Sequence, residues 1–189
     1  MFLCQHPAPL HITRRTTMTD FDFKTHFISL LPPDPPGLDL GFDEFITFNP
    51  TDLATLPAPD AEFLLKHGLP RDAAPFLSFE AYSQAEAQRR LAIFGIANHY
   101  YPLGHTGSGD VIALDRHSGT IVYFNHDAHH ARVLINTSLP QFARSLCVFQ
   151  AHLRDNTMAR CLPEIECIDP AAAVPGTMWA DEVSAELNG

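Results

Sequence analysis

The sequence predicts an α+β domain, because a β-rich centre lies between segments whose apolar residues recur with helical spacing. In the centre, the apolar runs 111–114 and 121–124 are separated by a turn cluster at 115–119, which predicts a β-hairpin. Neither run alternates strictly between apolar and polar residues. We therefore expect both faces of these strands to be covered, as in the middle of a sheet with helices on one side. Hydrophobic residues make up 46% of the 189 residues, which is enough for a sizeable core.

We expect a single domain over residues 19–189, preceded by a disordered extension at residues 1–18. Thr19 or Asp20 is expected to cap a first helix that runs to about Leu31. Its apolar face consists of residues at helical spacing, namely Phe23, Phe27, Leu30 and Leu31. Residues 32–59 are rich in proline, glycine and aspartate, which predicts a stiff connection that contributes only a short docked piece or strand.

A second helix is expected from Pro59 to His67, because Gly68 supplies a left-handed stop and Pro70 prevents continuation. Its buried side is expected to consist of Phe63, Leu64 and Leu65. A short strand is expected at 76–79. Residues 83–91 favour a helix, although the adjoining segment 91–94 is equally compatible with an extended chain.

The strongest helix signal begins at Ser138, which forms the pattern of a capping box with Gln141. The core-facing stripe of this helix consists of Leu139, Phe142, Leu146, Phe149 and Leu153. A strand at 133–135 precedes it. A last short helix at 179–187 is expected to place Trp179 against the domain.

The charge balance limits the classes of partner. Twelve Lys and Arg residues against 22 Asp and Glu residues give a formal charge of −10. This charge argues against nucleic acid and against an anionic membrane surface as ligands, and no apolar run approaches the length of a membrane span. It suits a basic protein partner, although moderate acidity is also common in proteins whose charge serves solubility alone.

The four cysteines predict reduced thiols in the cytoplasm, because none has C-x-x-C spacing and their number is low for a disulfide framework. Cys147 falls on the apolar stripe of the helix after Ser138, so we expect it in the core. The sequence alone does not decide whether Cys161 and Cys167 form a disulfide.

The glycine-rich segment 104–109 has G-x-x-G-x-G spacing, with no following lysine and with a strand after it where a phosphate loop requires a helix. We therefore expect a tight turn with positive φ and no phosphate site. There is also no G-x-S-x-G elbow and no cysteine–histidine signature, so we expect no enzyme.

Histidines raise the question of a metal. His126, His129 and His130 surround Asp127, and further histidines at 99, 105 and 117 are expected in nearby β loops. No pair has the helical spacing of a typical metal site, so we expect no metal and no cofactor. A small metal-dependent hydrolase that uses residues 126–130 is kept as an alternative function.

Three stretches of the chain share their order and spacing with a known family. The first is 56–64, which continues to Gly-Leu-Pro at 68–70. The second is 104–127, which reads G-x-x-G-x-G-D-x-I-x-L-D, a glycine turn, and I-V-Y-F-N-H-D. The third is 134–139 with Phe142 after it, and Trp179 also fits. Over about residues 51–179, the chain resembles the SUKH superfamily, most closely its fourth subgroup of bacterial immunity proteins and related binding modules.

The resemblance implies a SUKH-like fold, a central mixed, mostly antiparallel sheet flanked by helices, without catalytic residues. It also implies an antitoxin that binds a toxin domain, of nuclease or deaminase type, and covers its active site. The acidic charge agrees with a basic toxin. The remaining alternative within this fold is a housekeeping protein-interaction module.

Candidate partner-binding residues are aromatic and acidic groups near the glycine-rich segment that we expect to be exposed. They are Tyr100, Tyr101, Asp110, Asp115 and Asp127. The two tyrosines have an alternative interpretation, in which they simply pack on the sheet.

Overall fold

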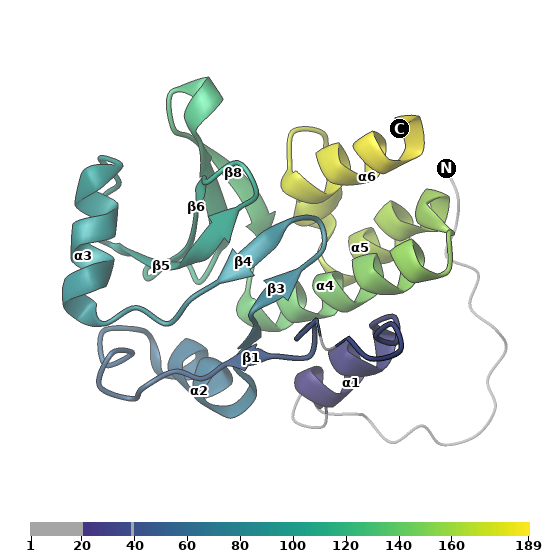
Figure 1. The fold of residues 1–189 in the computed structure, drawn as a ribbon. Helices are drawn as coiled ribbons and strands as arrows, with labels where there is room; N and C mark the ends of the chain where they lie inside the picture. Colours follow the sequence, from purple (N-terminus) through teal and green to yellow (C-terminus); the bar gives the residue numbers. More distant parts are fainter. Residues whose placement is uncertain (1–20, 39) are drawn as a thin grey trace, which may run out of the picture.

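The computed structural model describes residues 21–38 and 40–189. These residues form the α+β architecture expected from the sequence, with a central sheet between layers of helices (Figure 1). The predicted N-terminal extension, residues 1–18, and the predicted helix caps Thr19 and Asp20 lie outside the described residues.

The first helix, α1 (Phe23–Leu30), begins later than the sequence predicts. Its N-cap is Asp22, whose carboxylate accepts a hydrogen bond from the backbone N–H of Thr25 at 3.2 Å. Phe23, Phe27 and Leu30 are buried as predicted, and the helix packs against α4 (Leu139–Arg154).

Six strands form the central sheet as a meander in which each strand pairs with the next, and every pairing is antiparallel. They are β3 (Asp72–Ala73), β4 (Leu77–Phe79), β5 (Tyr100–Thr106), β6 (Val111–Asp115), β7 (Ile121–Asn125) and β8 (Ala131–Asn136). A small second sheet pairs β1 (Phe45–Ile46) with β2 (Leu69–Pro70). The predicted hairpin is confirmed as β6 and β7, and the strand predicted at 133–135 lies within β8.

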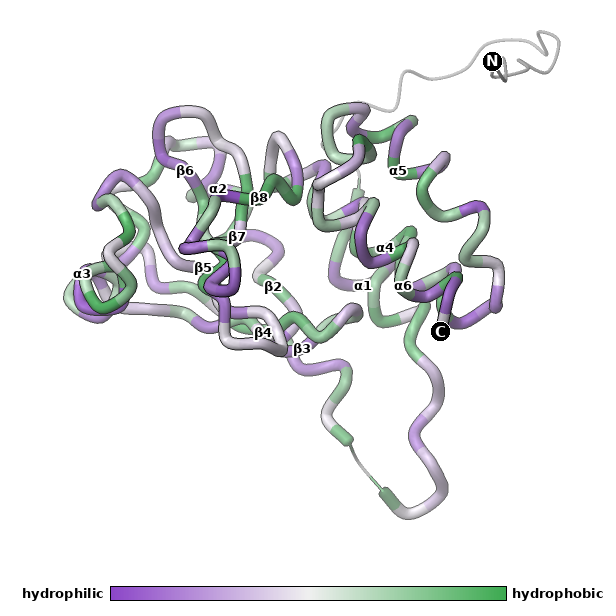
Figure 2. Tube along the Cα trace, turned by 90° about the horizontal axis from the view of Figure 1, so that it is seen from above, coloured by the Kyte–Doolittle hydropathy of each residue, from purple (hydrophilic) through white to green (hydrophobic). Residues whose placement is uncertain are grey.

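Both faces of the sheet are covered, because alternate side chains of β6 enter two separate cores. Ile112 and Leu114 join the larger core with the apolar stripe of α4, whereas Val111 and Ala113 join a smaller core with Leu91. Leu91 belongs to α3 (Gln84–Ile93). Seen from above, α3 lies on one side of the strands and α1 and α4 lie on the other (Figure 2). Helical cover therefore extends to the second face as well.

Two further predicted helices are confirmed with small changes. The helix α2 (Ala58–His67) ends at Gly68, whose φ of 66° is the expected left-handed stop. Leu64 is buried, but Leu65 is 44% exposed, because neighbouring positions differ by about 100° around a helix and the buried stripe is narrow. The helix α3 forms, and Ser83 caps it in a reciprocal capping box.

The C-terminal part packs over the larger core. It comprises α4, η3 (Met158–Arg160), α5 (Cys161–Ile168), η4 (Pro170–Ala173) and α6 (Met178–Asn188). The stripe of α4 is buried up to Phe149, whereas Leu153, in the last turn, is 40% exposed. Ser138 caps α4 as predicted, but the amide oxygen of Gln141 accepts the hydroxyl groups of Thr137 and Ser138, each at 2.6 Å, in place of the Ser138 backbone N–H, so the capping box is only half formed. The amide nitrogen of Gln141 donates to the Ile168 carbonyl at 3.1 Å.

A buried polar cluster joins the end of β8 to the C-terminal helices. It consists of Asn136, Ser145, Asp169 and Trp179. The Asn136 amide nitrogen donates to the Ser145 hydroxyl at 3.1 Å and to the Asp169 carboxylate at 3.0 Å. The Asn136 amide oxygen accepts the indole N–H of Trp179 at 2.9 Å. These bonds compensate the buried polar groups and fix α4 and α6 relative to the sheet.

Cysteine placement agrees with the prediction for Cys147, which is buried in the larger core. Cys161 and Cys167 lie six residues apart in α5, which corresponds to about 9 Å of helix rise. This separation exceeds the reach of a disulfide, so the bridge left open by the sequence does not form. Burial raises the pKa of the Cys147 and Cys161 thiols to about 12.

Among residues 21–38 and 40–189, no helix combines the length and the apolar character needed to cross a membrane.

Candidate functional site

Two hollows meet at the turn between β3 and β4 and share Pro75, Phe76, Leu77 and Gly107. The larger is a mainly apolar groove of about 640 Å³. The smaller has a volume of about 350 Å³ and a polar lining. We call these two hollows, together with the Phe76 side chain between them, the docking face.

Phe76 is the most prominent side chain of the docking face, because 78% of its surface is exposed. Its φ of 64° lies in the left-handed region, which is uncommon for a bulky residue. Gly107 makes room for it: a Cβ at Gly107 would lie 2.9 Å from the Phe76 Cβ. The fold thus holds a large aromatic ring in solvent. Aromatic side chains that become buried when a complex forms dominate the binding energy of protein interfaces.

The apolar groove is built by segments that are distant in the sequence. Its walls come from the end of α1, the connection ahead of β1, the β3–β4 turn and α4, and they include Leu31, Pro32, Phe42, Phe149 and Leu153. Phe42 is 43% exposed and Leu153 is 40% exposed. An accessible groove with these walls suits an aliphatic or aromatic side chain of a partner.

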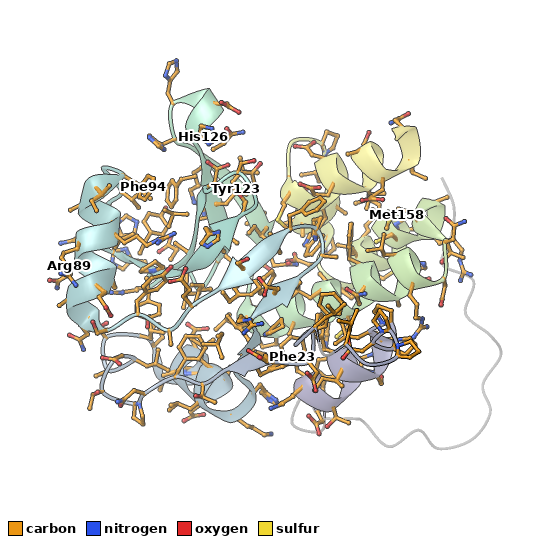
Figure 3. All side chains as sticks on the ribbon, in the orientation of Figure 1. Phe23, Arg89, Phe94, Tyr123, His126 and Met158 are labelled. Atoms are coloured by element: carbon orange, nitrogen blue, oxygen red, sulfur yellow. The ribbon has the colours of Figure 1, made fainter. Side chains whose placement is uncertain are left out.

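The polar hollow is acidic. Asp110, Asp127 and Glu182 line it, and among the described residues no Lys or Arg lines either hollow. Burial, and after it the charge of Asp181, raises the pKa of Glu182. Burial first, and then the charges of Asp181 and Asp110, also raises the pKa of Tyr123, which projects from β7 (Figure 3). Burial is the larger cause of both pKa shifts, and the neighbouring carboxylates add to it.

Asp110 holds the connection after β7 in place. Its Oδ1 accepts the backbone N–H of His126 at 2.9 Å and lies 2.6 Å from the Nδ1 atom of His126. The Nε2 atom of His126 lies 3.2 Å from the Asp127 carboxylate. The hydrogen bond with Asp110, followed by the charge of Asp127, raises the pKa of His126 above its usual 6.5. Both ring nitrogens therefore face carboxylates at the tip of this connection (Figure 3).

The structure brings together only two of the five predicted partner-binding residues, Asp110 and Asp127, and the expected exposure of Asp110 is wrong, because its side chain is 7% exposed. Tyr100 is 7% exposed, and its ring packs edge-on against Phe124 with ring centroids 5.0 Å apart. Tyr101 is fully buried, and its hydroxyl donates to the Tyr82 carbonyl at 3.0 Å. The expected exposure of both tyrosines is wrong, because β5 is a central strand with side chains in both cores.

Asp115, the fifth predicted residue, lies at the opposite end of β6 from Asp110 and serves the β6–β7 turn. Its Oδ1 accepts the backbone N–H groups of His117 at 2.9 Å and Ser118 at 3.4 Å. Sequence reasoning also missed Phe76 and Glu182 in the docking face. The available signal for Phe76 was a large aromatic residue directly after Pro75, between two short strands.

The first half of the glycine-rich segment is strand, since β5 extends to Thr106. Gly104 has no positive φ. It is required because a Cβ there would lie 2.0 Å from the Ser78 carbonyl oxygen of the neighbouring strand. Only Gly109, with a φ of 86°, takes the turn role that we expected of the segment. No helix follows it, so the arrangement lacks the features of a phosphate loop.

Metal-ligating side chains converge at one place among the described residues. His99, Asp115 and His117 have ligand atoms that all lie within 4.8 Å of one another. The region 126–130, which the alternative hydrolase hypothesis uses, has no such group of three in the described part of the chain.

Comparison with known proteins gives the family. Residues 38–186 match the SUKH-4 immunity protein family, a range that runs from the connection ahead of β1 into α6. This range extends beyond residues 51–179, over which the sequence showed the resemblance, and adds residues 38–50. Neither the comparison with curated proteins nor the comparison with solved structures found a match. Because the match covers most of the 189 residues, the chain belongs to the SUKH-4 immunity protein family.

Proposed function

We propose that this chain is an immunity protein that acts in the cytoplasm and covers the active site of a basic toxin domain of nuclease or deaminase type. Family membership supports the general role of an immunity protein that binds a protein toxin. The observation that carries the finer proposal is the docking face, where an apolar groove and an acidic hollow meet at Phe76.

The apolar part of the docking face supplies affinity. Phe76 is available to enter a pocket of the toxin, while the groove beside it accepts an apolar side chain in return. A few such anchors carry most of the binding free energy of an interface, because their surface is fully removed from water. The toxin is inactive in the complex because its active site is covered.

The acidic part of the docking face speeds association with the toxin and selects for a basic partner. Three carboxylates in the smaller hollow, without a lining Lys or Arg among the described residues, attract a basic surface and repel an acidic one. The formal charge of −10 acts in the same direction at long range. A nuclease active site that binds phosphates is basic and therefore matches this field.

Binding is favoured over catalysis at this face. His126 is the nearest candidate for a general base, but its two ring nitrogens are directed at Asp110 and Asp127. Neither nitrogen is then available to a substrate or to a metal. This arrangement supports the non-catalytic role over the alternative metal-dependent hydrolase.

The experiment pairs the purified chain with the toxin domain encoded immediately upstream of its gene. Growth rescue on co-expression tests neutralisation, and calorimetry gives the Kd of the complex. We expect Phe76→Ala to weaken binding by at least about 30-fold and to abolish rescue, because it removes a central aromatic anchor. Its urea unfolding midpoint should stay unchanged, since the ring is mostly exposed.

A matched control is Ile93→Ala in α3, because Ile93 has the same exposed fraction, 78%, and lies in the other helical layer. This variant should bind within twofold of the wild type. If both Phe76→Ala and Ile93→Ala still neutralise the toxin, the toxin binds a different part of the surface. Failure of the wild type to bind or neutralise any neighbouring toxin removes the antitoxin role and leaves the housekeeping interaction module.

A further inference from the structure

A second cluster lies at the opposite end of β6 from the docking face. His99 precedes β5, Asp115 ends β6, and His117 lies in the β6–β7 turn. Their ligand atoms all lie within 4.8 Å of one another. The two imidazole rings are nearly parallel, with an interplanar angle of 8° and centroids 5.0 Å apart.

Backbone hydrogen bonds hold the three residues in this arrangement. The Arg116 N–H donates to the His99 carbonyl at 3.0 Å, which ties the start of β5 to the turn. Asp115 orients its carboxylate by accepting the N–H groups of His117 and Ser118 on Oδ1. Oδ2 then remains to bind a cation, and the bonds to Oδ1 act as the outer partners that orient a metal-ligating carboxylate.

The surrounding charges favour a cation. Arg116 stands between two of the residues in the sequence, but its guanidinium carbon lies 5.9 Å from the centroid of the Tyr101 ring, away from an ion pair with Asp115. The carboxylate of Asp115 is therefore left to a cation.

We propose that His99, Asp115 and His117 form a binding site for one first-row divalent metal ion, with Zn²⁺ as the best match. Two imidazole nitrogens and one carboxylate oxygen are ligands that Zn²⁺ prefers. Tetrahedral Zn²⁺ places ligand atoms roughly 3.3 Å apart, as its bond lengths of about 2.1 Å require. Side-chain rotation closes the remaining distance, because His117 is exposed. The fourth position is left for water.

The proposed ion clamps the β6–β7 turn to the start of β5. It binds the folded chain and not the unfolded one, so above its Kd it raises the unfolding temperature with the logarithm of its concentration. The proposed site departs from our expectation from the sequence that the chain binds no metal. It is independent of the docking face, because β6 separates the two by roughly 17 Å of strand.

Calorimetric titration of the metal-free full chain with ZnCl₂ tests the site, with the absorption spectrum of Co²⁺ as a second readout. We expect Zn²⁺ to bind at micromolar Kd or tighter and to raise the unfolding temperature by roughly 5 °C at 100-fold excess over Kd. His99→Ala and His117→Ala should each weaken this binding by more than about 100-fold, because even the loss of an outer partner costs 10–100-fold.

Asp115→Asn is the most discriminating variant, because it retains the oxygen that accepts both backbone N–H groups and removes only the charge. It should weaken Zn²⁺ binding by at least about 10-fold and leave the unfolding temperature in EDTA unchanged. The control, His126→Ala with His129→Ala, should bind Zn²⁺ within twofold of the wild type. The proposal is overturned if the wild type shows no Zn²⁺ binding when Zn²⁺ is present at a 100-fold excess over protein. It is also overturned if the control variant loses Zn²⁺ binding while the variants of His99, Asp115 and His117 retain it.

Discussion

The buried polar cluster and the docking face lie on one domain and have opposite properties. In the cluster, Asn136 and Trp179 are fully buried, and their polar atoms bond to each other. In the docking face, Phe76 is 78% exposed, and the carboxylates around it face a hollow. Asn136 and Trp179 belong to the stretches that carry the family resemblance, whereas Phe76 does not. The comparison teaches that the residues behind the family resemblance serve packing, whereas the residues to which we assign partner binding are ones that packing leaves free.

The largest effect on stability is expected from a substitution in the buried polar cluster. Asn136→Ala removes the hydrogen-bond partner of the Trp179 indole and one partner of the buried Asp169 carboxylate. Unsatisfied buried groups cost about 1–3 kcal/mol each, so we expect the free energy of unfolding to fall by about 3 kcal/mol. Urea unfolding followed by circular dichroism measures it, and the fluorescence of Trp179, the single tryptophan, reports on the same site.

Ser145→Ala is the matched control, because it removes only one acceptor of the Asn136 amide nitrogen and leaves the bond to Asp169. It should lower the free energy of unfolding by about 1 kcal/mol. Both variants should bind the toxin normally once folded. A loss of stability below 1 kcal/mol for Asn136→Ala would show that the cluster is dispensable.

The next largest effect is expected from a substitution that should disturb both the packing of the sheet and the docking face. Gly104→Ala places a methyl group 2.0 Å from the Ser78 carbonyl oxygen, so β4 must move away from β5. We expect a loss of about 2–3 kcal/mol in the free energy of unfolding, the upper range for overpacking. Because the turn that carries Phe76 directly precedes β4, toxin binding should weaken as well. A variant with wild-type stability in urea would contradict the close approach.

Gly107→Ala acts on the docking face alone. Its new Cβ would lie 2.9 Å from the Phe76 Cβ, and the exposed turn is able to move. We expect the Kd for the toxin to rise by about 10-fold as the anchor is displaced, while the free energy of unfolding changes by less than about 1 kcal/mol. Calorimetry and urea unfolding on the same sample separate the two quantities. Unchanged affinity would exclude Phe76 as an anchor.

The sequence predicted the fold well wherever local chemistry decides the structure. Gly68 ends α2, Ser138 caps α4, and the turn at 115–119 forms the hairpin. It failed where several partners compete for one group. The amide oxygen of Gln141 accepts the Thr137 and Ser138 hydroxyls in place of the Ser138 backbone N–H, and its amide nitrogen donates to the distant Ile168 carbonyl.

The candidate site was predicted less well, for a physical reason. Exposure depends on which strands lie in the centre of the sheet, and the sequence does not give strand order. Tyr100 and Tyr101 therefore carried the same signal as surface aromatics and are buried, whereas Phe76 carried the signal of a core strand and is exposed. Asp110 and Asp127 meet only because β6 and β7 pair in the observed register.

The smallest expected effect concerns the connection between β7 and β8, where the docking face depends on a titrating group. The hydrogen bond with Asp110, and then the charge of Asp127, raises the pKa of His126 above 6.5. A group with a raised folded-state pKa contributes stability that is fully present below its unfolded pKa. This contribution is therefore present below pH 6.5 and is lost as the pH rises through the higher folded-state pKa of His126.

We expect amide hydrogen exchange at residues 126–128 to become faster, relative to the rest of the chain, as the pH rises from 6 to 8.5 and His126 loses its proton. The change is modest, because the backbone N–H of His126 also donates to Asp110, and this bond does not require a protonated ring. An NMR titration of the His126 ring measures the pKa directly. In Asp110→Asn the carboxylate charge is absent, so this pKa should fall back toward 6.5 and the extra pH dependence should disappear. An identical titration curve in that variant would show that Asp110 does not control this part of the docking face.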